Sequence, residues 1–385
     1  MTKQQPPFKI NDIIELKITG LGSSGEGVGK AEGFTVFVHG ALPGEIVSVK
    51  LFQVKKSYAS GKILNIIEPS AQRVKPECPY YENCGGCQLQ HLSYEGQLAV
   101  KRQQVQDALE RIGHIKGCGV MPVLGMENPW HYRNKMQFPV SRNEGKIQIG
   151  CYAAQTHNVI DIDSCIIQKQ ANNKIMQVVR SWMREFNVPA YDETTGKGVV
   201  RHVMGRVGVR SGEVMAVIIT ACYDIPHAGE LVTMLKSEVD GLKSIIQNIN
   251  KKRTNIIMGN KNRVLYGKGT IKDKLGNLKF NISPLSFFQV NSAQTEKLYA
   301  TALEFADLQG SETVIDCYCG TGTISLYLAQ KARKVYGIEI VEPAIKDANE
   351  NAAANNITNA QFICGDAAVE MPALLNSGVE PDVVL

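Results

Sequence analysis

The stretch that most restricts how this chain can fold is residues 313–329, TVIDCYCGTGTISLYLA. Its first residues have strand propensity, and the run that starts at Ile324 has the apolar spacing of a helix. Gly320 and Gly322 lie between the two and allow a tight turn close to a ligand. A strand that leads into a helix through such a loop directs free backbone N–H groups and the positive helix end at one point.

A second strand, residues 334–339, follows this loop and ends in the carboxylate of Glu339. An acid at that place can accept hydrogen bonds from the two hydroxyls of a ribose. Together the loop and the acid predict a site for a nucleoside cofactor. The spacing argues against NAD, because Ser325 stands where a dinucleotide-binding loop has its third glycine. The form Asp-x-x-Cys-Gly-x-Gly, which begins at Asp316, resembles motif I of class I S-adenosylmethionine (SAM) methyltransferases.

Length and composition set broad limits. A chain of 385 residues predicts two or three domains. It has no apolar run long enough to span a membrane, and its first residues are too polar for a secretory signal, so we expect a cytoplasmic protein. The net charge of +5 permits a polyanionic partner without requiring one. In that compartment the ten cysteines should not form disulfides, and a spaced cluster of them would indicate a metal site.

Residues 8–68 have the features of a small all-β unit. Five short β-branched stretches separated by glycine turns predict a barrel of the OB type. We expect five lysines on its surface, and contact with RNA: Lys30, Lys50, Lys55, Lys56 and Lys62. The stretch 25–45, GEGVGKAEGFTVFVHGALPGE, also resembles a TRAM domain, which is an RNA-binding barrel.

Three thiols lie within ten residues at Cys78, Cys84 and Cys87, with Gly85-Gly86 allowing a sharp turn between two of them. Thiolates wrapped around a soft metal centre need such a tight curl. A fourth ligand is required, and the downstream candidates are Cys118, Cys151 and Cys165, of which Cys165 is best placed by its context. Zinc and a [4Fe–4S] cluster both fit four cysteines, although the C-x5-C-x2-C spacing favours iron–sulfur over zinc.

Mixed helices and strands follow and indicate an α+β region. Phosphates could be bound by Arg133, Lys135, Arg201, His202 and the run 251–253, Lys-Lys-Arg. We expect His202 to be a hydrogen-bonded strand histidine and not a catalyst. Residues 264–291 predict a hairpin that ends in a loop. Asn291 is a plausible N-cap of the helix that comes next, and the loop could present Gln289 to the cofactor.

Essentially the whole chain resembles the RNA uracil-C5 methyltransferases of the iron–sulfur-containing 23S rRNA type. The motifs that carry the resemblance are the TRAM-like start, the four cysteines, and the stretches YRNKMQFPV, PLSFFQVN and DCYCGTGT. It implies a multidomain α/β fold in three parts. These are an OB-like TRAM barrel (1–70), a central α+β iron–sulfur domain (71–280), and an incomplete Rossmann-like class I methyltransferase domain (281–385).

The same resemblance implies the site residues. Cys78, Cys84, Cys87 and Cys165 would hold a [4Fe–4S] cluster, and four residues would contact SAM: Gln289, Tyr318, Glu339 and Asp366. The partner would be a uridine-containing loop of 23S rRNA, and we expect a monomer. In this family a cysteine thiolate adds to C6 of the uracil and C5 then attacks the methyl group of SAM. A base removes the C5 proton, the thiolate leaves, and the target base must first be taken out of its stack.

One departure from the family pattern concerns the C-terminus. The family's Asp-Pro-Pro-Arg segment, its nucleophilic cysteine and its basic glutamate would all follow Leu385, so we expect no catalytic residue here and an inactive, truncated chain. Cys317 and Cys319 belong to the cofactor loop, and we do not expect either to replace the nucleophile. Two alternatives remain open: a non-catalytic RNA-binding iron–sulfur protein, and a tRNA m5U methyltransferase.

Overall fold

The computed structural model describes residues 6–385, which form two compact units. One unit comprises the chain up to Pro129 together with Ala153–Thr156, and the other comprises Trp130–Tyr152 and His157–Leu385. Each has its own hydrophobic core. The three-part division at residues 70 and 280 remains a prediction.

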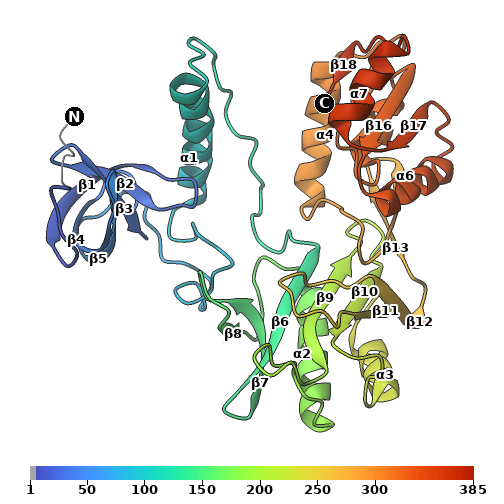
Figure 1. Ribbon diagram of the computed structural model, residues 1–385, viewed down its shortest axis with the longest axis horizontal. Helices are drawn as coiled ribbons and strands as arrows, with labels where there is room; N and C mark the ends of the chain where they lie inside the picture. Colours follow the sequence, from blue (N-terminus) through green and yellow to red (C-terminus); the bar gives the residue numbers. More distant parts are fainter. Residues whose placement is uncertain (1–5) are drawn as a thin grey trace. The chain divides into compact units, whose positions relative to one another are not determined.

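The first unit begins with a closed five-stranded barrel, as predicted (Figure 1). Its strands are β1 (Ile13–Leu21), β2 (Gly27–Ala31), β3 (Phe34–His39), β4 (Ile46–Val54) and β5 (Tyr58–Glu68), in the order β1-β2-β3-β5-β4. Alternate apolar residues fill the interior, among them Leu16, Val36 and Val49. All five lysines predicted on the barrel surface are exposed.

Beyond the barrel, the described residues of the first unit form one helix, α1 (Tyr94–Asp107), which continues as a turn of π-helix, η1 (Ala108–Ile112). The Ser93 side chain caps α1 by accepting a hydrogen bond from the Gly96 N–H. The segment between barrel and helix is joined to the barrel by a partly buried ion pair. The Arg73 Nε and Nη2 groups donate to the two carboxylate oxygens of the fully buried Glu45 at 2.6 and 2.8 Å.

The second unit contains a seven-stranded sheet in the order β12-β11-β10-β9-β6-β7-β8. The strands are β6 (Lys135–Asn143), β7 (Lys146–Tyr152), β8 (Val159–Asp161), β9 (Val200–Val207), β10 (Val214–Thr220), β11 (Leu242–Ile249) and β12 (Lys261–Gly267). Only the pair β10–β11 is parallel. Two helices, α2 (Gln170–Glu185) and α3 (Ala228–Glu238), pack together on one face of this sheet.

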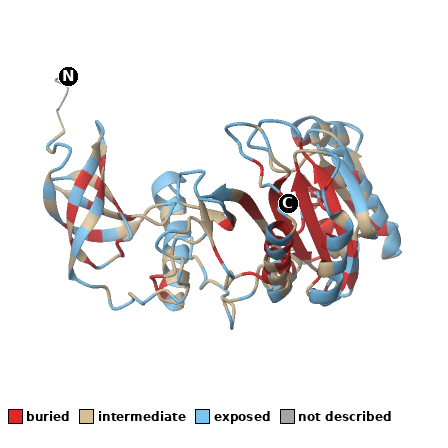
Figure 2. Cartoon of the chain, turned by 90° about the horizontal axis from the view of Figure 1, so that it is seen from below, coloured by how far each residue is buried: buried red, intermediate tan, exposed pale blue. Residues whose placement is uncertain are grey.

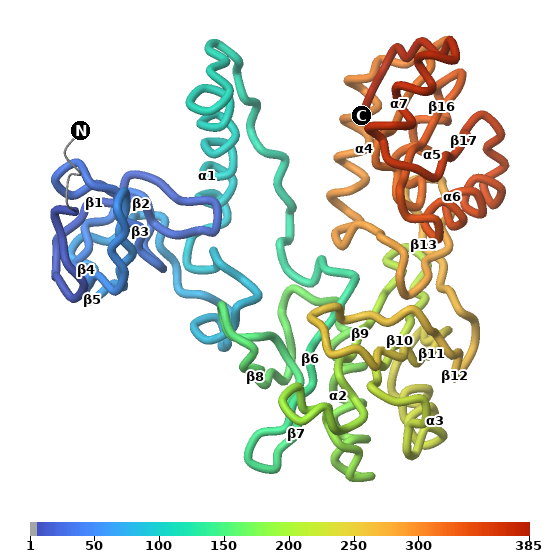
Figure 3. Tube along the Cα trace, viewed as in Figure 1, coloured from blue at the N-terminus to red at the C-terminus, as the bar shows by residue number. Residues whose placement is uncertain are grey.

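A hairpin of β13 (Ile271–Leu275) and β14 (Leu278–Ile282) connects this sheet to the C-terminal part of the unit, and Figure 3 follows the chain through it. The hairpin predicted within residues 264–291 is confirmed as β13–β14, although the first residues of that range belong to β12, which pairs with β11. The hairpin is buried on the other face of the seven-stranded sheet. There Phe280 and Ile271 belong to one core with Met204, Leu326 and Ala352.

The C-terminal part is a four-stranded parallel sheet in the order β17-β16-β15-β18. Its elements are α4 (Ser292–Ala306), β15 (Thr313–Asp316), α5 (Thr323–Ala329), β16 (Lys334–Glu339), α6 (Glu342–Ala354), β17 (Ala360–Cys364), α7 (Ala367–Asn376) and β18 (Val383–Val384). Val314 packs with α5 on one face, and Ile315 packs toward α7 on the other. Helices therefore cover both faces, which is the predicted Rossmann-like arrangement. Every residue of β15 is buried and β16 is partly buried, whereas β17 and β18 consist of half-buried and exposed residues. Figure 2 shows how buried residues are distributed along the chain.

No helix among residues 6–385 is long and apolar enough to cross a lipid bilayer.

The Glu45–Arg73 pair yields a prediction about stability. Burial raises the pKa of Glu45, but hydrogen bonds from Arg73 and from the Leu42 and Ser70 N–H groups outweigh burial and hold that pKa below its usual value. Arg73→Met leaves a buried carboxylate without its cation. We expect it to lower the free energy of unfolding at pH 7 by roughly 3 kcal/mol.

The pH dependence follows from the lowered pKa. The pair stabilises the fold fully above the unfolded-state pKa of Glu45, and this contribution is lost as the pH falls through the lower folded-state pKa. Urea unfolding of Arg73→Met and wild type should therefore converge in acid. Arg102→Met is the control, because the Arg102 Nε donates only to the Val120 carbonyl in an exposed bond. A difference that persists unchanged in acid would contradict this account.

Candidate cofactor site

The strand order of the C-terminal sheet determines where a ligand can bind. From β15 the chain moves through β16 to β17 on one side, and β18 then pairs on the other side of β15. Open parallel sheets bind ligands outside the C-terminal ends of their strands at the point where the order reverses. That point lies at Asp316, where the glycine loop 317–322 begins.

The loop has the left-handed backbone expected at its two glycines, with φ of +55° at Gly320 and +79° at Gly322. A Cβ atom on Gly322 would lie 2.9 Å from Cζ of Phe362, so a side chain there would also lack space. The Cys319 N–H donates to the Ile338 carbonyl at 2.9 Å and attaches the loop to the neighbouring strand β16.

Glu339, the predicted acid, lies at the end of β16 and is bonded directly to this loop. Its Oε2 accepts a hydrogen bond from the Gly320 N–H at 3.2 Å, and its Oε1 accepts one from the Val341 N–H at 2.9 Å. Each carboxylate oxygen has a second lone pair, so both can still accept hydrogen bonds from a diol. The structure thus joins the two features that predicted a nucleoside site.

Asp316 fixes the start of the loop. It is buried, and its carboxylate accepts a hydrogen bond from the Ser325 hydroxyl at 2.6 Å and one from the Tyr318 N–H at 3.3 Å. Burial raises the pKa of Asp316. Ser325, whose position argued against NAD, therefore has a structural role as the donor that pairs with this carboxyl group.

Exposed apolar side chains from three segments surround the loop. Tyr318 is 82% exposed, Ile340 is 67% exposed and Phe287 is 65% exposed. The Thr321 hydroxyl donates to the Phe287 carbonyl at 3.2 Å, which brings the segment before α4 against the loop. Large exposed apolar side chains next to the polar backbone groups of the loop form a surface suited to a flat, partly apolar ligand such as a nucleobase.

The other two predicted contacts have different surroundings. Gln289 is half-buried, and among the residues that the structure describes its side-chain amide has no hydrogen-bond partner. Asp366 follows β17 and caps α7, since its carboxylate accepts a hydrogen bond from the Ala368 N–H at 2.9 Å. The Gly365 N–H donates to the Glu339 carbonyl at 3.0 Å, so Asp366 also lies at the C-terminal edge of the sheet.

Residues distant in sequence hold the segment that carries Gln289. The Asn134 amide donates to the Gln289 carbonyl at 2.9 Å, and the Ser286 hydroxyl donates to Asp347 at 2.7 Å. Arg206 donates to the Ser286 carbonyl at 2.5 Å. Burial lowers the pKa of Arg206 to about 10. Sequence reasoning missed Asn134, Arg206 and Asp347, because each of them acts on a partner more than sixty residues away.

The two loop cysteines are poorly suited to be nucleophiles. Burial raises the pKa of both thiols, and the Asp316 carboxylate raises them further. The thiolate is the reactive form of cysteine, so both side chains are held in the unreactive form. This agrees with the expectation that neither Cys317 nor Cys319 attacks the base.

The four cysteines predicted as metal ligands are all partly buried, and no disulfide joins them. Cys78, Cys84 and Cys87 lie in the first unit, where the Gly86 N–H donates to the Cys84 sulfur at 3.4 Å. Cys165 lies in the second unit, and its backbone is held by the Asn173 amide. Among residues 6–385, no three His, Cys, Asp or Glu side chains are grouped as a metal site. Four thiols are donors of the right chemistry for an iron–sulfur cluster.

Two predictions for the central sheet were wrong. Within the described part of the chain, neither ring nitrogen of the buried His202 has a hydrogen-bond partner, and burial lowers its pKa to about 4. Arg201 is also buried, and it donates to the carbonyls of Asn250 and Lys252, so its guanidinium is not available to a phosphate.

A glycine loop at the reversal point of a parallel sheet, bonded to a strand-end acid, defines a domain that binds a nucleoside-type cofactor. Residues 93–376 match the tRNA (Uracil-5-)-methyltransferase family, and residues 7–64 match the TRAM domain. The chain belongs to the tRNA (Uracil-5-)-methyltransferase family.

Individual relatives agree with this assignment. The chain is 52% identical over 383 residues to an RNA methyltransferase of Clostridium tetani, covering 100% of this chain and 83% of the relative. It is 49% identical to one of Halalkalibacterium halodurans, covering 100% of this chain and 84% of the relative. A solved structure, the Pyrococcus abyssi tRNA (uracil-54, C5)-methyltransferase in complex with S-adenosyl-L-homocysteine, matches with a TM-score of 0.73 and 25% identity. That match covers 92% of this chain and 80% of the other.

These comparisons confirm the uracil-5-methyltransferase family and the TRAM domain. They give no support to the expectation of a truncated and inactive chain, because the relatives align along essentially all of it.

The loop geometry predicts the effect of Gly322→Ala. This change places a Cβ at positive φ and against Phe362 and Ala348, so it should lower the free energy of unfolding by about 1 to 3 kcal/mol. Thermal unfolding measures the loss. Gly229→Ala is the matched control, because its Cβ meets nothing within 4 Å and its φ is not positive. Equal melting temperatures for the two variants would contradict the assigned strain.

Proposed function

We propose that this protein transfers a methyl group from S-adenosylmethionine to C5 of uridine in RNA. The observation that carries the proposal is the hydrogen bond between the Gly320 N–H and Glu339, which joins the glycine loop to the strand-end acid at the reversal point of the sheet. Membership of the uracil-5-methyltransferase family supports the reaction type. The related Pyrococcus abyssi enzyme was solved with the demethylated product of this donor.

Each residue of the site has a proposed task toward the donor. Glu339 accepts hydrogen bonds from the ribose hydroxyls, and Tyr318 covers the adenosyl group with its exposed ring. The amide of Gln289 contacts the amino-acid part of the donor, and Asp366 reaches toward the adenine amine. Asp366 is the weaker contact, because one of its oxygens is already bonded to the Ala368 N–H. Bound SAM would supply an electrophilic methyl group to an attacking carbon.

The base must be activated, since C5 of uracil is a poor nucleophile. We propose that a cysteine thiolate adds to C6, that C5 takes the methyl group, and that a base removes the C5 proton as the thiolate leaves. Cys317 and Cys319 are not that nucleophile, because their pKa values are raised.

The proposed substrate is 23S rRNA, with tRNA as the second candidate. The exposed lysines of the TRAM barrel suit a phosphate backbone of either kind. The overall sequence pattern, including the cysteine run, favours 23S rRNA. The name of the Pyrococcus abyssi neighbour favours tRNA.

Methyl transfer from labelled SAM to isolated 23S rRNA and to bulk tRNA tests the function, with the modified nucleoside identified by mass spectrometry. We expect 5-methyluridine in 23S rRNA and not in tRNA. The opposite distribution would replace the rRNA assignment, and another modified nucleoside would overturn uridine C5 as the target.

Glu339→Gln tests the cofactor site separately from RNA. The change removes the charge that strengthens hydrogen bonds to a diol, so calorimetry with S-adenosylhomocysteine should show affinity reduced roughly tenfold or more. Glu342→Gln is the control, because Glu342 is an exposed residue of the adjoining helix α6. Unchanged affinity for Glu339→Gln would remove this residue from the site.

We propose that Cys78, Cys84, Cys87 and Cys165 hold a [4Fe–4S] cluster with a structural role. The support is their spacing, their shared partial burial and the N–H donor at the Cys84 sulfur. Cys84→Ser should then give protein with little iron and sulfide after anaerobic purification, and lower solubility. Cys118→Ser, which changes an exposed thiol, should keep both. Zinc in colourless wild-type protein, or full iron content in Cys84→Ser, would refute the cluster.

A further inference from the structure

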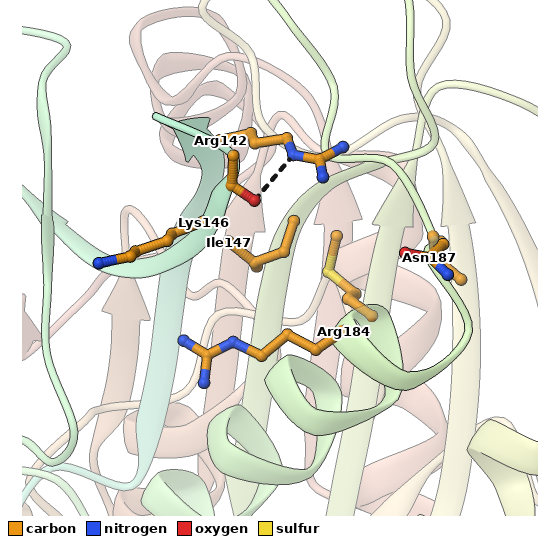
Figure 4. Close-up of a pocket in the computed structure, with 8 residues that line it drawn as sticks. Arg142, Lys146, Ile147, Arg184 and Asn187 are labelled. Carbon is orange, nitrogen blue, oxygen red and sulfur yellow. Dashed lines mark hydrogen bonds between the residues drawn. The ribbon is translucent and has the colours of Figure 1, made fainter.

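A cavity of about 510 Å³ lies in the second unit, between the β6–β7 hairpin and the C-terminal end of α2 (Figure 4). It is lined by Arg142, Gly145, Lys146, Ile147, Met183, Arg184, Asn187 and Val188. None of the residues assigned to the cofactor or to the cluster is among them. The cavity is therefore a separate feature, and its size is that of a small-ligand or single-nucleotide site.

The hairpin geometry places Arg142 beside the apolar residue Ile147. Glu144 and Gly145 form the two-residue turn, with φ of +47° and +78°, and Asn143 pairs with Lys146 across it. Arg142 pairs with Ile147, so the two side chains share one face of the hairpin. Further along the same face, Val140 pairs with Ile149, and both side chains are buried in the core.

The helix provides the opposite wall. Met183 and Val188 are buried and, with Ile147, give the cavity an apolar floor. Arg184 lies in the last turn of α2, and Figure 4 shows it on the other side of Ile147 from Arg142. Asn187, next to the floor residue Val188, has a positive φ of +52°.

Three cations at this cavity have no acidic partner. Arg142, Lys146 and Arg184 are exposed, and no ion pair joins any of them to a carboxylate within residues 6–385. Arg142 is positioned by its Nε–H, which donates to the Gly145 carbonyl at 3.1 Å and leaves the Nη groups to a ligand. Cations outside ion pairs, next to an apolar floor, favour an anion that also has a flat or apolar part.

We propose that this cavity binds one nucleotide of an RNA chain, outside the catalytic centre. Arg142 and Arg184, on opposite sides of Ile147, hold the phosphates on the two sides of this nucleotide, and Lys146 adds positive charge on the other face of the hairpin. The ribose and base lie over Ile147 and Met183 against a guanidinium plane. A free inorganic phosphate suits the site less, because the nearby helix end is the negative C-terminal end and offers no N–H groups. This inference rests on the proposed RNA substrate, but not on the identity of the methyl donor.

The test compares two triple variants of equal charge in the full chain. R142A/K146A/R184A removes the site. K236A/K243A/K268A removes three exposed lysines near β11 and β12, at the other edge of the seven-stranded sheet. Fluorescence anisotropy with a uridine-containing single-stranded RNA should show affinity at least about tenfold lower for the first variant than for the control. The slope of log affinity against log salt should also fall by about one to three.

Two further measurements separate the possible failures. Calorimetry with S-adenosylhomocysteine should give wild-type affinity for both variants, so a loss there would mean a folding defect and not a lost RNA contact. Uridine monophosphate should bind weakly and compete with the RNA only at high concentration. Equal RNA affinity in the two variants would overturn the proposal. Tight uridine monophosphate binding at the cavity with unchanged RNA binding would also overturn it and indicate a free-nucleotide site.

Discussion

The buried core between the two sheets of the second unit is the interaction on which the candidate site depends. A four-stranded parallel sheet is small, and the apolar side chains of its helices that point away from the sheet must be shielded from water. Phe280 of the β13–β14 hairpin provides part of it, in a single cluster with Met204 of the larger sheet and Leu326 of α5. The free energy of burying these apolar side chains holds the cofactor loop and the central sheet as one unit.

Polar contacts between the two sheets hold the segment that carries Gln289. Asn134, just before β6, and Arg206, near the end of β9, hold the segment 284–289 from the side of the larger sheet. Asp347 of α6 holds the same segment from the side of the smaller sheet. A buried arginine is costly unless its charge is compensated, and here carbonyl oxygens and the nearby Asp347 carboxylate compensate it. The position of Gln289 is thus an outcome of packing between two sheets, and local loop sequence does not determine it.

This explains which parts of the site could be predicted from the sequence. The strand, the glycine loop and Glu339 follow from local rules, because glycine conformation, strand propensity and a fixed spacing act over about twenty-five residues. The closed barrel and its exposed lysines follow from alternation of apolar residues. Asn134 and Arg206 could not be found in this way, since their partners lie far along the chain. The error at His202 has the same cause. A strand pattern indicates burial, but whether a partner lies opposite depends on tertiary packing.

Charge is distributed unevenly over the second unit, and the distribution separates two kinds of ligand. Carboxylates gather at the ends of β15 to β17, namely Asp316, Glu339 and Asp366. The methyl donor carries a positively charged sulfonium, which such a set favours, whereas a phosphodiester would be repelled there. The hairpin cavity has the reverse character, with three cations and no ion pair to a carboxylate in the described chain. An RNA backbone drawn to the cations would leave only the neutral uracil to approach the acidic site. The modest net charge of +5 hides this separation, because it averages over both surfaces.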